Sequence, residues 1–155
     1  MKNKILIPVD SPDFSLQIIP QIKSMFDPED ITLILLRVEE EPELIHIERP
    51  GFEDLDVYVD TQMFNQRSRF RVSMHDMATA LEAEGFKVET EVFFGEPTER
   101  IDDAIRDYNV DMVAMVTHGR HGWDRIRHGS VAEHVVRHTN VPVLLLHSEV
   151  EPVPA

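Results

Sequence analysis

The residues best suited to chemistry are concentrated in one stretch of the C-terminal third, where glycine is interspersed with arginine and histidine. Three glycines, Gly119, Gly122 and Gly129, follow the apolar run Asp111–Val116 and precede Val131–His138, whose apolar residues have helical spacing. An anion bound between such a strand and helix would meet free backbone N–H groups and the helix dipole. Glycine also lets a phosphate come close to the backbone. The pattern therefore predicts a loop that binds phosphate or a nucleotide.

Three arginines would add positive charge to this loop of an otherwise acidic chain: Arg120, Arg125 and Arg127. The same residues also have an explanation that needs no ligand. Ser130 and Glu133 have the spacing of a capping box, which closes a helix N-terminus by itself. Glycines are ordinary turn residues between a strand and a helix. The local pattern alone leaves phosphate binding and simple capping as open alternatives.

A second polar position stands at the end of the first apolar run. Asp10 follows Lys4–Val9, which is typical of a buried strand. Pro8 should lie at the end of that strand, because proline donates no ladder hydrogen bond. Asp10 is then either a polar contact at the binding edge of a sheet or a turn residue. Asp13 and Ser15 are rival caps for the helix that follows.

The elements that would position these residues alternate between strand and helix. After the first strand, apolar spacing predicts a helix from near Ser15 to Phe26. An interior proline costs a helix about 3 kcal/mol, so Pro20 either kinks this helix or marks where its regular part begins. A second buried strand is expected over Ile31–Val38.

The segment from Glu39 to Asp60 is strongly acidic, with nine acidic residues and a single arginine. Its prolines and glycine predict an irregular, solvated insertion at 39–60, and partner binding by this segment is the alternative. The longest helix is then expected from about Asp60 to Glu84, ended by Gly85. Its methionine-rich stripe is interpreted as core and not as a binding surface.

The second half of the chain continues the alternation. Lys87–Phe94 alternates in hydrophobicity and predicts a half-exposed edge strand. Pro97 should occupy the first position of the next helix. The glycine loop and its flanking strand and helix follow, and Val141–Leu146 predicts the last strand.

This order predicts an α/β fold, with a doubly wound, mostly parallel sheet and helices on both faces. Ligands of such sheets bind beyond the carboxyl ends of the strands, where the strand order reverses. Asp10, Val38 and the loop after Val116 would all lie at that edge. The meeting of three separate segments favours a binding site there.

Size and composition point to one domain over residues 1–148, followed by a flexible tail at 149–155 in this chain of 155 residues. The formal net charge of −14 argues against nonspecific binding to nucleic acid or to anionic membranes. The chain has no cysteine, and no apolar run approaches the ~20 residues of a membrane span. The N-terminus has no signal-peptide pattern, so we expect a cytoplasmic protein.

Five segments, in sequence order, resemble the universal stress protein family: Ile5–Asp10, Gly95–Pro97, Asp111–Met115, Thr117–His138 and Val141–Leu144. The resemblance covers nearly the whole chain, and the C-terminal block is its most specific part. It implies a five-stranded parallel sheet of strand order 3-2-1-4-5 and a protein that is usually dimeric. Many members of the family bind ATP, and others bind no nucleotide.

The nucleotide signature of that family, G-x2-G-x9-G-[S/T], is only partly present. Gly119 is its second glycine, and Gly129 with Ser130 follows at the right spacing. Val116 occupies the first glycine position. A valine there would crowd the ribose or the α-phosphate, and it disfavours a positive φ.

The resemblance implies an ATP site with a divalent cation, Mg or Mn, carried on the phosphates. The implied nucleotide-binding residues are Pro8, Val9, Asp10, Val38, Met115, Val116, Gly119, Arg120, Gly122, Gly129, Ser130 and Val131. The first four would flank adenine and ribose, and those from Gly119 onward would cradle the phosphates.

We therefore expect a stress-response module that binds ATP and acts by binding and dimerisation. An all-apolar edge strand needs a cover, so the homodimer should form through Val141, Val143, Leu144, Leu145 and Leu146. A nucleotide-free dimer is the first alternative, for which Val116 argues. A slow ATPase, with His118 or His128 assisting a water, is the second. Dedicated catalysis is disfavoured, because the sequence has no evident activated nucleophile and no GK[S/T] phosphate loop.

Metal or pH sensing is a further alternative, since five histidines lie near one another in sequence: His118, His121, His128, His134 and His138. The last two have an i, i+4 spacing that suits a metal. No cysteine or HEXXH motif supports a metal site. We therefore interpret these histidines as surface residues of the last helix. A phospho-receiver domain is excluded, because no Asp ends the third strand and no acidic pair follows the first.

Overall fold

The computed structural model describes residues 3–10, 12–41, 55–118 and 131–148. Its strands form one five-stranded sheet in the order β3-β2-β1-β4-β5, and every neighbouring pair is parallel. The strands are β1 (Asn3–Pro8), β2 (Ile31–Glu39), β3 (Lys87–Phe94), β4 (Met112–His118) and β5 (Val143–Ser148). The predicted α/β fold class and strand order are confirmed.

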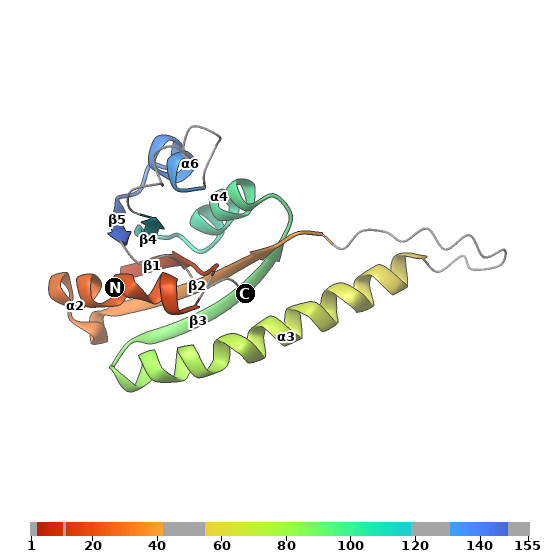
Figure 1. The fold of residues 1–155 in the computed structure, drawn as a ribbon, viewed down its shortest axis with the longest axis horizontal. Coiled ribbons are helices and arrows are strands. Elements are labelled where there is room, and N and C mark those ends of the chain that lie inside the picture. Colours follow the sequence, from red (N-terminus) through yellow and green to blue (C-terminus); the bar gives the residue numbers. More distant parts are fainter. Residues whose placement is uncertain (1–2, 11, 42–54, 119–130, 149–155) are drawn as a thin grey trace.

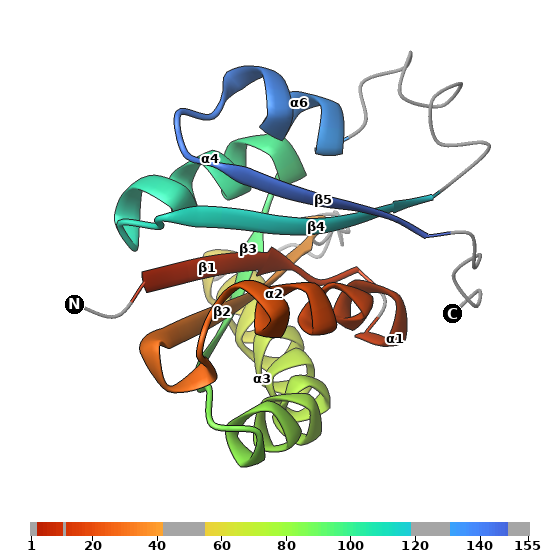
Figure 2. The same cartoon turned by 90° about the vertical axis from the view of Figure 1, so that its left-hand side faces the viewer.

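Helices cover both faces of the sheet (Figures 1 and 2). On one face lie α1 (Pro12–Ser15), the 3-10 turn η1 (Leu16–Ile18), α2 (Ile19–Met25) and α3 (Leu55–Ala83). On the other lie α4 (Pro97–Asp107) and α6 (Val131–His138). A second 3-10 turn, η2 (Pro28–Asp30), directly precedes β2. Because helices enclose both faces, the central strands are apolar on both sides.

Alternation along each strand divides the core into two clusters. On β1, Ile5 and Ile7 pack beneath α2 and α3, whereas Leu6 packs beneath α4 and α6. Ile34 and Leu36 of β2 join Leu6 on the second face. We call these two sides the α2/α3 face and the α4/α6 face.

The first helical segment is broken, as Pro20 predicted. Its regular part, α2, begins at Ile19 with Pro20 in the first turn, where the missing N–H costs nothing. The alternative in which regular helix starts near Pro20 is therefore confirmed. Ser15 is buried, and its Oγ accepts a hydrogen bond from the backbone N–H of Asp10 at 3.3 Å.

The long helix α3 begins at Leu55, five residues before the expected start. The expectation of an irregular segment up to Asp60 is thus wrong for its last six residues, since no proline or glycine follows Gly51 to prevent helix. Residues 42–54 of that segment lie outside the described residues. α3 packs on the sheet through the buried Met74, Met77 and Leu81, with Met63 and Phe70 partly buried against the same cluster, which confirms the methionine stripe as core. The N-terminal end of the helix projects beyond the strands (Figure 1).

The last strand is displaced from its expected position. β5 starts at Val143 and runs to Ser148, because its register with β4 pairs Val113 with Val143. Ser148, the last residue of the expected domain, is buried, and its Oγ donates to Oε1 of Gln17 at 2.6 Å. Residues 149–155 lie outside the described part of the chain. Among the described helices, none is both long and apolar enough to cross a membrane.

Candidate functional site

The carboxyl ends of the three central strands meet at one edge of the sheet. β1 lies between β2 and β4, and the strand order reverses between β1 and β4. Pro8 pairs with Leu36 on β2, so Asp10 and Val38 lie at the same edge, and Val116 ends the apolar part of β4 beside them. An open parallel sheet offers its ligand crevice at such a reversal.

The backbone at the end of β1 is held from two sides. The Val9 N–H donates to the carbonyl of Leu36 at 2.8 Å. The carbonyl of Asp10 accepts from Nη1 of Arg37 at 2.5 Å, and the Asp10 N–H donates to Ser15. The Asp10 carboxylate itself is exposed. The result is a fixed backbone that presents an exposed carboxylate at the edge.

Arg37 is a residue of this edge that sequence reasoning missed. Besides Asp10, its guanidinium pairs with the Glu39 carboxylate and lies 5.0 Å from the centre of the Phe70 ring on α3. It therefore joins β2, the segment after β1, and the long helix. The sequence feature that could have identified Arg37 is its charge, which interrupts the apolar run of β2.

The described site residues are divided between the two faces of the sheet. Val9 and Val116 pack with the cluster on the α2/α3 face. Val38, Met115 and Val131 pack with the cluster on the α4/α6 face, and Val131 is the first residue of α6. The Val116 side chain is thus directed to the face opposite α6.

The residues that would contact phosphates fall mostly outside the described part of the chain. These are Gly119, Arg120, Gly122, Gly129 and Ser130. The last described residue before them is His118 at the end of β4, and the first after them is Val131. The loop therefore connects the carboxyl edge to a helix N-terminus, which is the connection that the sequence predicted.

α6 is tied to α4 by a histidine–carboxylate contact. Nε2 of His134 lies 2.8 Å from Oδ2 of Asp102, and both side chains are partly buried. The His138 ring stacks on His134 with centroids 4.5 Å apart. The interpretation as surface residues holds for the exposed His138, and His134 is partly buried against α4. No group of three or more His, Cys, Asp or Glu side chains suited to a metal ion occurs among the described residues.

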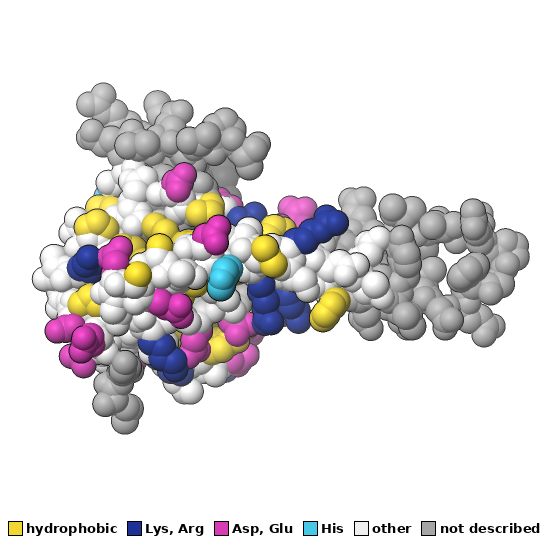
Figure 3. Space-filling view, turned by 90° about the horizontal axis from the view of Figure 1, so that it is seen from below, with side chains coloured by type: hydrophobic (Ala, Val, Ile, Leu, Met, Phe, Trp, Pro, Cys, Tyr) yellow, Lys and Arg dark blue, Asp and Glu magenta, His cyan; other side chains and the backbone are white. Residues whose placement is uncertain are grey.

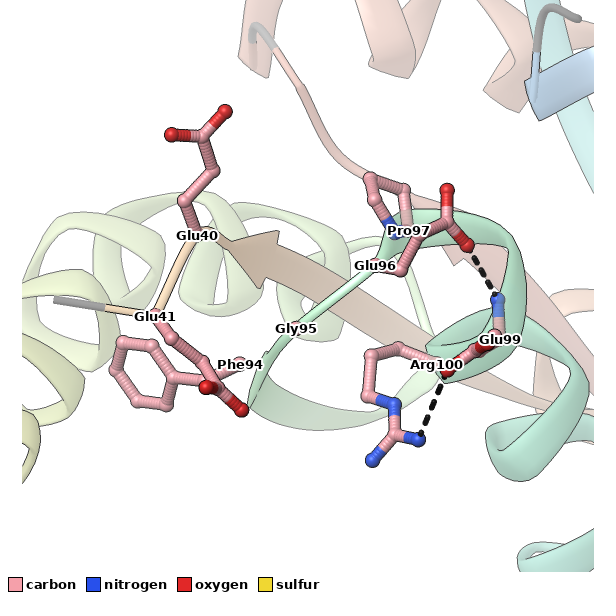
Figure 4. A pocket seen from close by; sticks show the side chains of 8 residues that line it. All are labelled: Glu40, Glu41, Phe94, Gly95, Glu96, Pro97, Glu99 and Arg100. Carbon is pink, nitrogen blue, oxygen red and sulfur yellow. Dashed lines mark hydrogen bonds and ion pairs between the residues drawn. The ribbon is translucent and has the colours of Figure 1, made fainter. Parts of the chain in front are cut away.

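A hollow of about 520 Å³ lies beside this edge, where β2 and β3 end and α4 begins (Figure 4). Four glutamates surround it, and we call this hollow the acidic mouth: Glu40, Glu41, Glu96 and Glu99. Phe94, Gly95, Pro97 and Arg100 complete its lining. None of these eight residues belongs to the nucleotide-binding set that the sequence resemblance implies.

Glu96 has a structural role in that lining. Its carboxylate accepts from the Thr98 hydroxyl and from the Glu99 N–H, the latter at 3.0 Å, and so caps α4. These two hydrogen bonds, the Thr98 bond first, hold the pKa of Glu96 below its ordinary value. Pro97 is in the first turn of α4, as predicted.

Comparison with known proteins agrees with this architecture. Residues 1–147 match the model of the universal stress protein family. The chain belongs to that family. Universal stress protein MJ0577 of Methanocaldococcus jannaschii is 37% identical over 73 residues, a segment that covers 47% of this chain and 45% of that protein. The solved structure of MJ0577 superposes with a TM-score of 0.73 and 26% identity, covering 97% of this chain and 99% of that one.

Two more distant structures share the fold and carry bound nucleotides. A universal stress protein in complex with cAMP gives a TM-score of 0.63 at 16% identity, covering 94% of this chain and 97% of that one. A family member from Arabidopsis thaliana with AMP bound gives a TM-score of 0.55 at 16% identity, covering 99% of this chain and 96% of that one.

Proposed function

We propose that this chain is a cytoplasmic universal stress protein that binds an adenine nucleotide, ATP with Mg or Mn, and acts by binding and homodimerisation. The proposal rests on the carboxyl edge, where β1, β2 and β4 end beside the reversal of strand order. Two proteins of the same fold carry AMP and cAMP, which supports an adenine nucleotide as the ligand class.

The position of Val116 is the observation that carries the proposal. A valine in place of the first motif glycine argues against binding if its isopropyl group crowds the ribose or the α-phosphate, or if the position needs a positive φ, which Val116 does not have. Val116 packs instead with the α2/α3 cluster, whereas α6, whose N-terminus follows the loop, lies on the other face. The bulk of the valine is therefore directed away from the helix that would receive the phosphates.

The remaining residues have chemistry suited to the parts of a nucleotide. Val38 is partly exposed and offers apolar surface for the base, and the exposed Asp10 carboxylate is an acceptor for ribose hydroxyls. Val9 is buried on the opposite face of the sheet, so it would contribute through its backbone. Gly119, Arg120, Gly122, Gly129, Ser130 and Val131 would surround the phosphates, with backbone N–H groups and one guanidinium as donors. A divalent cation would neutralise part of the phosphate charge.

Isothermal titration calorimetry with ATP and Mg²⁺ tests the proposal. We expect binding at micromolar ligand, and a roughly tenfold loss of affinity in Asp10→Ala, because the nucleotide loses a charge-assisted hydrogen bond. Asp13→Ala removes a nearby exposed carboxylate on α1 and serves as the matched control. Absence of heat at high micromolar nucleotide would contradict the proposal.

A nucleotide-free dimer is the second candidate, because the motif glycine is missing. Val116→Gly distinguishes the two. If the wild type binds, the variant should change ATP affinity by less than about threefold, since the side chain lies on the other face. Binding that appears only in Val116→Gly would establish the nucleotide-free alternative.

A further inference from the structure

The projecting helix α3 carries an unusual segregation of charge. Residues 61–75 contain three arginines and one histidine but no acidic residue, in a chain with 29 acidic residues. Phe64 and Val72 in this segment are 70% and 73% exposed. Exposed apolar groups beside concentrated positive charge are typical of an interaction surface.

Several of these basic and exposed apolar side chains lie on one side of α3. Phe64, Arg67, Arg71 and His75 are spaced by three or four residues and so share a side of the helix; we call them the α3 row. Figure 3 shows Lys and Arg side chains beside hydrophobic ones on this part of the molecule. Each member of the row is exposed.

The α3 row adjoins the acidic mouth. The guanidinium of Arg67 lies 5.6 Å from the centre of the Phe94 ring, which lines the mouth. Nη2 of Arg71 lies 3.6 Å from the Glu91 carboxylate on the neighbouring strand. A basic, aromatic surface and an acidic hollow are thus side by side around Phe94.

We propose that a second copy of this chain docks here about a twofold axis, with the α3 row of each copy against the acidic mouth of the other. Adjacent patches of opposite charge are self-complementary under a twofold rotation, because each patch then meets its opposite on both sides of the axis. Phe64 enters the hollow of the other copy, and Arg67 and Arg71 face its glutamates. This interface is separate from the nucleotide site and from β5.

The charge distribution selects a second copy over an anionic polymer. The row is bordered by the glutamates of the mouth, and the whole chain has a formal net charge of −14. Nucleic acid or an anionic membrane in contact with the row would also meet those carboxylates and be repelled. A partner that presents both signs in the reverse order avoids this repulsion.

Two charge-reversed chains test the interface by light scattering at micromolar concentration. The first carries Arg67→Glu and Arg71→Glu, and the second carries Glu41→Arg and Glu99→Arg, which leaves the helix cap at Glu96 intact. Each chain alone should have half the mass of the wild type, because like charges then face each other. An equimolar mixture should regain the wild-type mass, since the reversed row of one chain meets the reversed mouth of the other.

Arg69→Glu is the matched control, because it lies two positions from Arg67 and so points to another side of α3. It should leave the mass unchanged. Circular dichroism confirms that each chain folds, and Phe64→Gln is a second disruptive variant that keeps all charges. Wild-type mass in both reversed chains, or a mixture that stays at half mass, would overturn the proposal. Calorimetry with ATP reports on the nucleotide site independently of this result.

Discussion

Arg37 shows how one side chain connects the candidate binding edge to the rest of the molecule. Its guanidinium donates to the Asp10 carbonyl, pairs with Glu39 and stacks on Phe70. A planar fork makes these contacts together, which the single ammonium of a lysine does not. The position of the Asp10 carboxylate therefore depends on a residue that need not touch the nucleotide.

Arg37→Lys should lower ATP affinity about three- to tenfold, because the charge is kept but the backbone at Asp10 loses its donor. Calorimetry measures the effect. Phe70→Leu is the control, since it removes the aromatic stack and leaves the hydrogen bond to Asp10. Equal losses of affinity in both variants would mean that packing, and not the position of Asp10, is responsible.

Glu96 gives a prediction about stability and pH. Glu96→Ala should destabilise the protein by about 1 kcal/mol near neutral pH, because the α4 N-terminus loses its cap. The pKa of this carboxyl in the folded state lies below the ordinary value of 4.5. Its contribution is therefore present above pH 4.5 and is lost as the pH falls through the folded pKa.

Chemical denaturation of wild type and Glu96→Ala between pH 7 and pH 3 checks this. The difference in unfolding free energy should shrink as the solution becomes acidic. A difference that stays constant to pH 3 would assign the effect to side-chain packing. Glu99→Ala, which removes an exposed carboxylate from the same turn, should show a smaller change throughout.

The place of Asp10 just after a strand was predictable from sequence because its signal is local: a polar residue directly after an apolar run. Arg37 was not, because its partners come from β1, β2 and α3, and no spacing along the chain encodes their meeting. His134 was missed for the same reason, since Asp102 lies 32 residues away. Local patterns identify the ends of strands, whereas the contacts that fix those ends depend on tertiary packing.

At the scale of elements, a polar contact holds α6 to α4 beside an apolar interface. Ala132 and Val135 of α6 are buried with Ile101 and Ala104 of α4. The His134–Asp102 pair lies beside them. Because α6 begins directly after the proposed phosphate loop, the contact also fixes where that loop ends.

Asp102→Ala should lower the unfolding free energy by about 1 kcal/mol and speed hydrogen exchange of the α6 amides, because a partly buried contact between helices is lost. Arg137→Ala is the control. It removes an i, i+4 pair with Glu133 that lies within α6 alone, so its cost should stay near 0.3–0.5 kcal/mol. Equal exchange rates in the two variants would contradict a role for the interhelical contact.

Apolar runs in the sequence do not fix exactly where a strand begins or ends. The sequence placed the last strand at Val141–Leu146, yet pairing with β4 starts it at Val143. The run starting at Val141 is apolar because Val141 packs on the α4/α6 cluster before the strand begins. Burial and strand pairing are separate requirements, and hydrophobicity reports only the first.

At the scale of the whole molecule, the two edges of the sheet differ in character. β3 carries Lys87, Glu89 and Glu91 along its length, and such charges discourage pairing with another strand. β5 has four consecutive aliphatic residues that remain partly exposed on both faces, from Val143 to Leu146. Of the two sheet edges, β5 is therefore the better candidate for the homodimer of the proposed function, a contact separate from the one between the α3 row and the acidic mouth.

The direction of the backbone hydrogen bonds of β5 identifies which residue to substitute in order to test a dimer through this edge. The Val113 N–H donates to the Pro142 carbonyl at 3.0 Å, so the strand period directs the backbone groups of Val143 and Leu145 away from β4. Leu145→Lys places a charge at this free edge, where its aliphatic stem still covers part of the α4/α6 cluster. We expect the mass measured by light scattering to fall by half, with the circular dichroism spectrum unchanged. Met25→Lys, on an exposed position of α2, should leave the mass unaltered, and an unchanged mass in Leu145→Lys would place the dimer contact elsewhere.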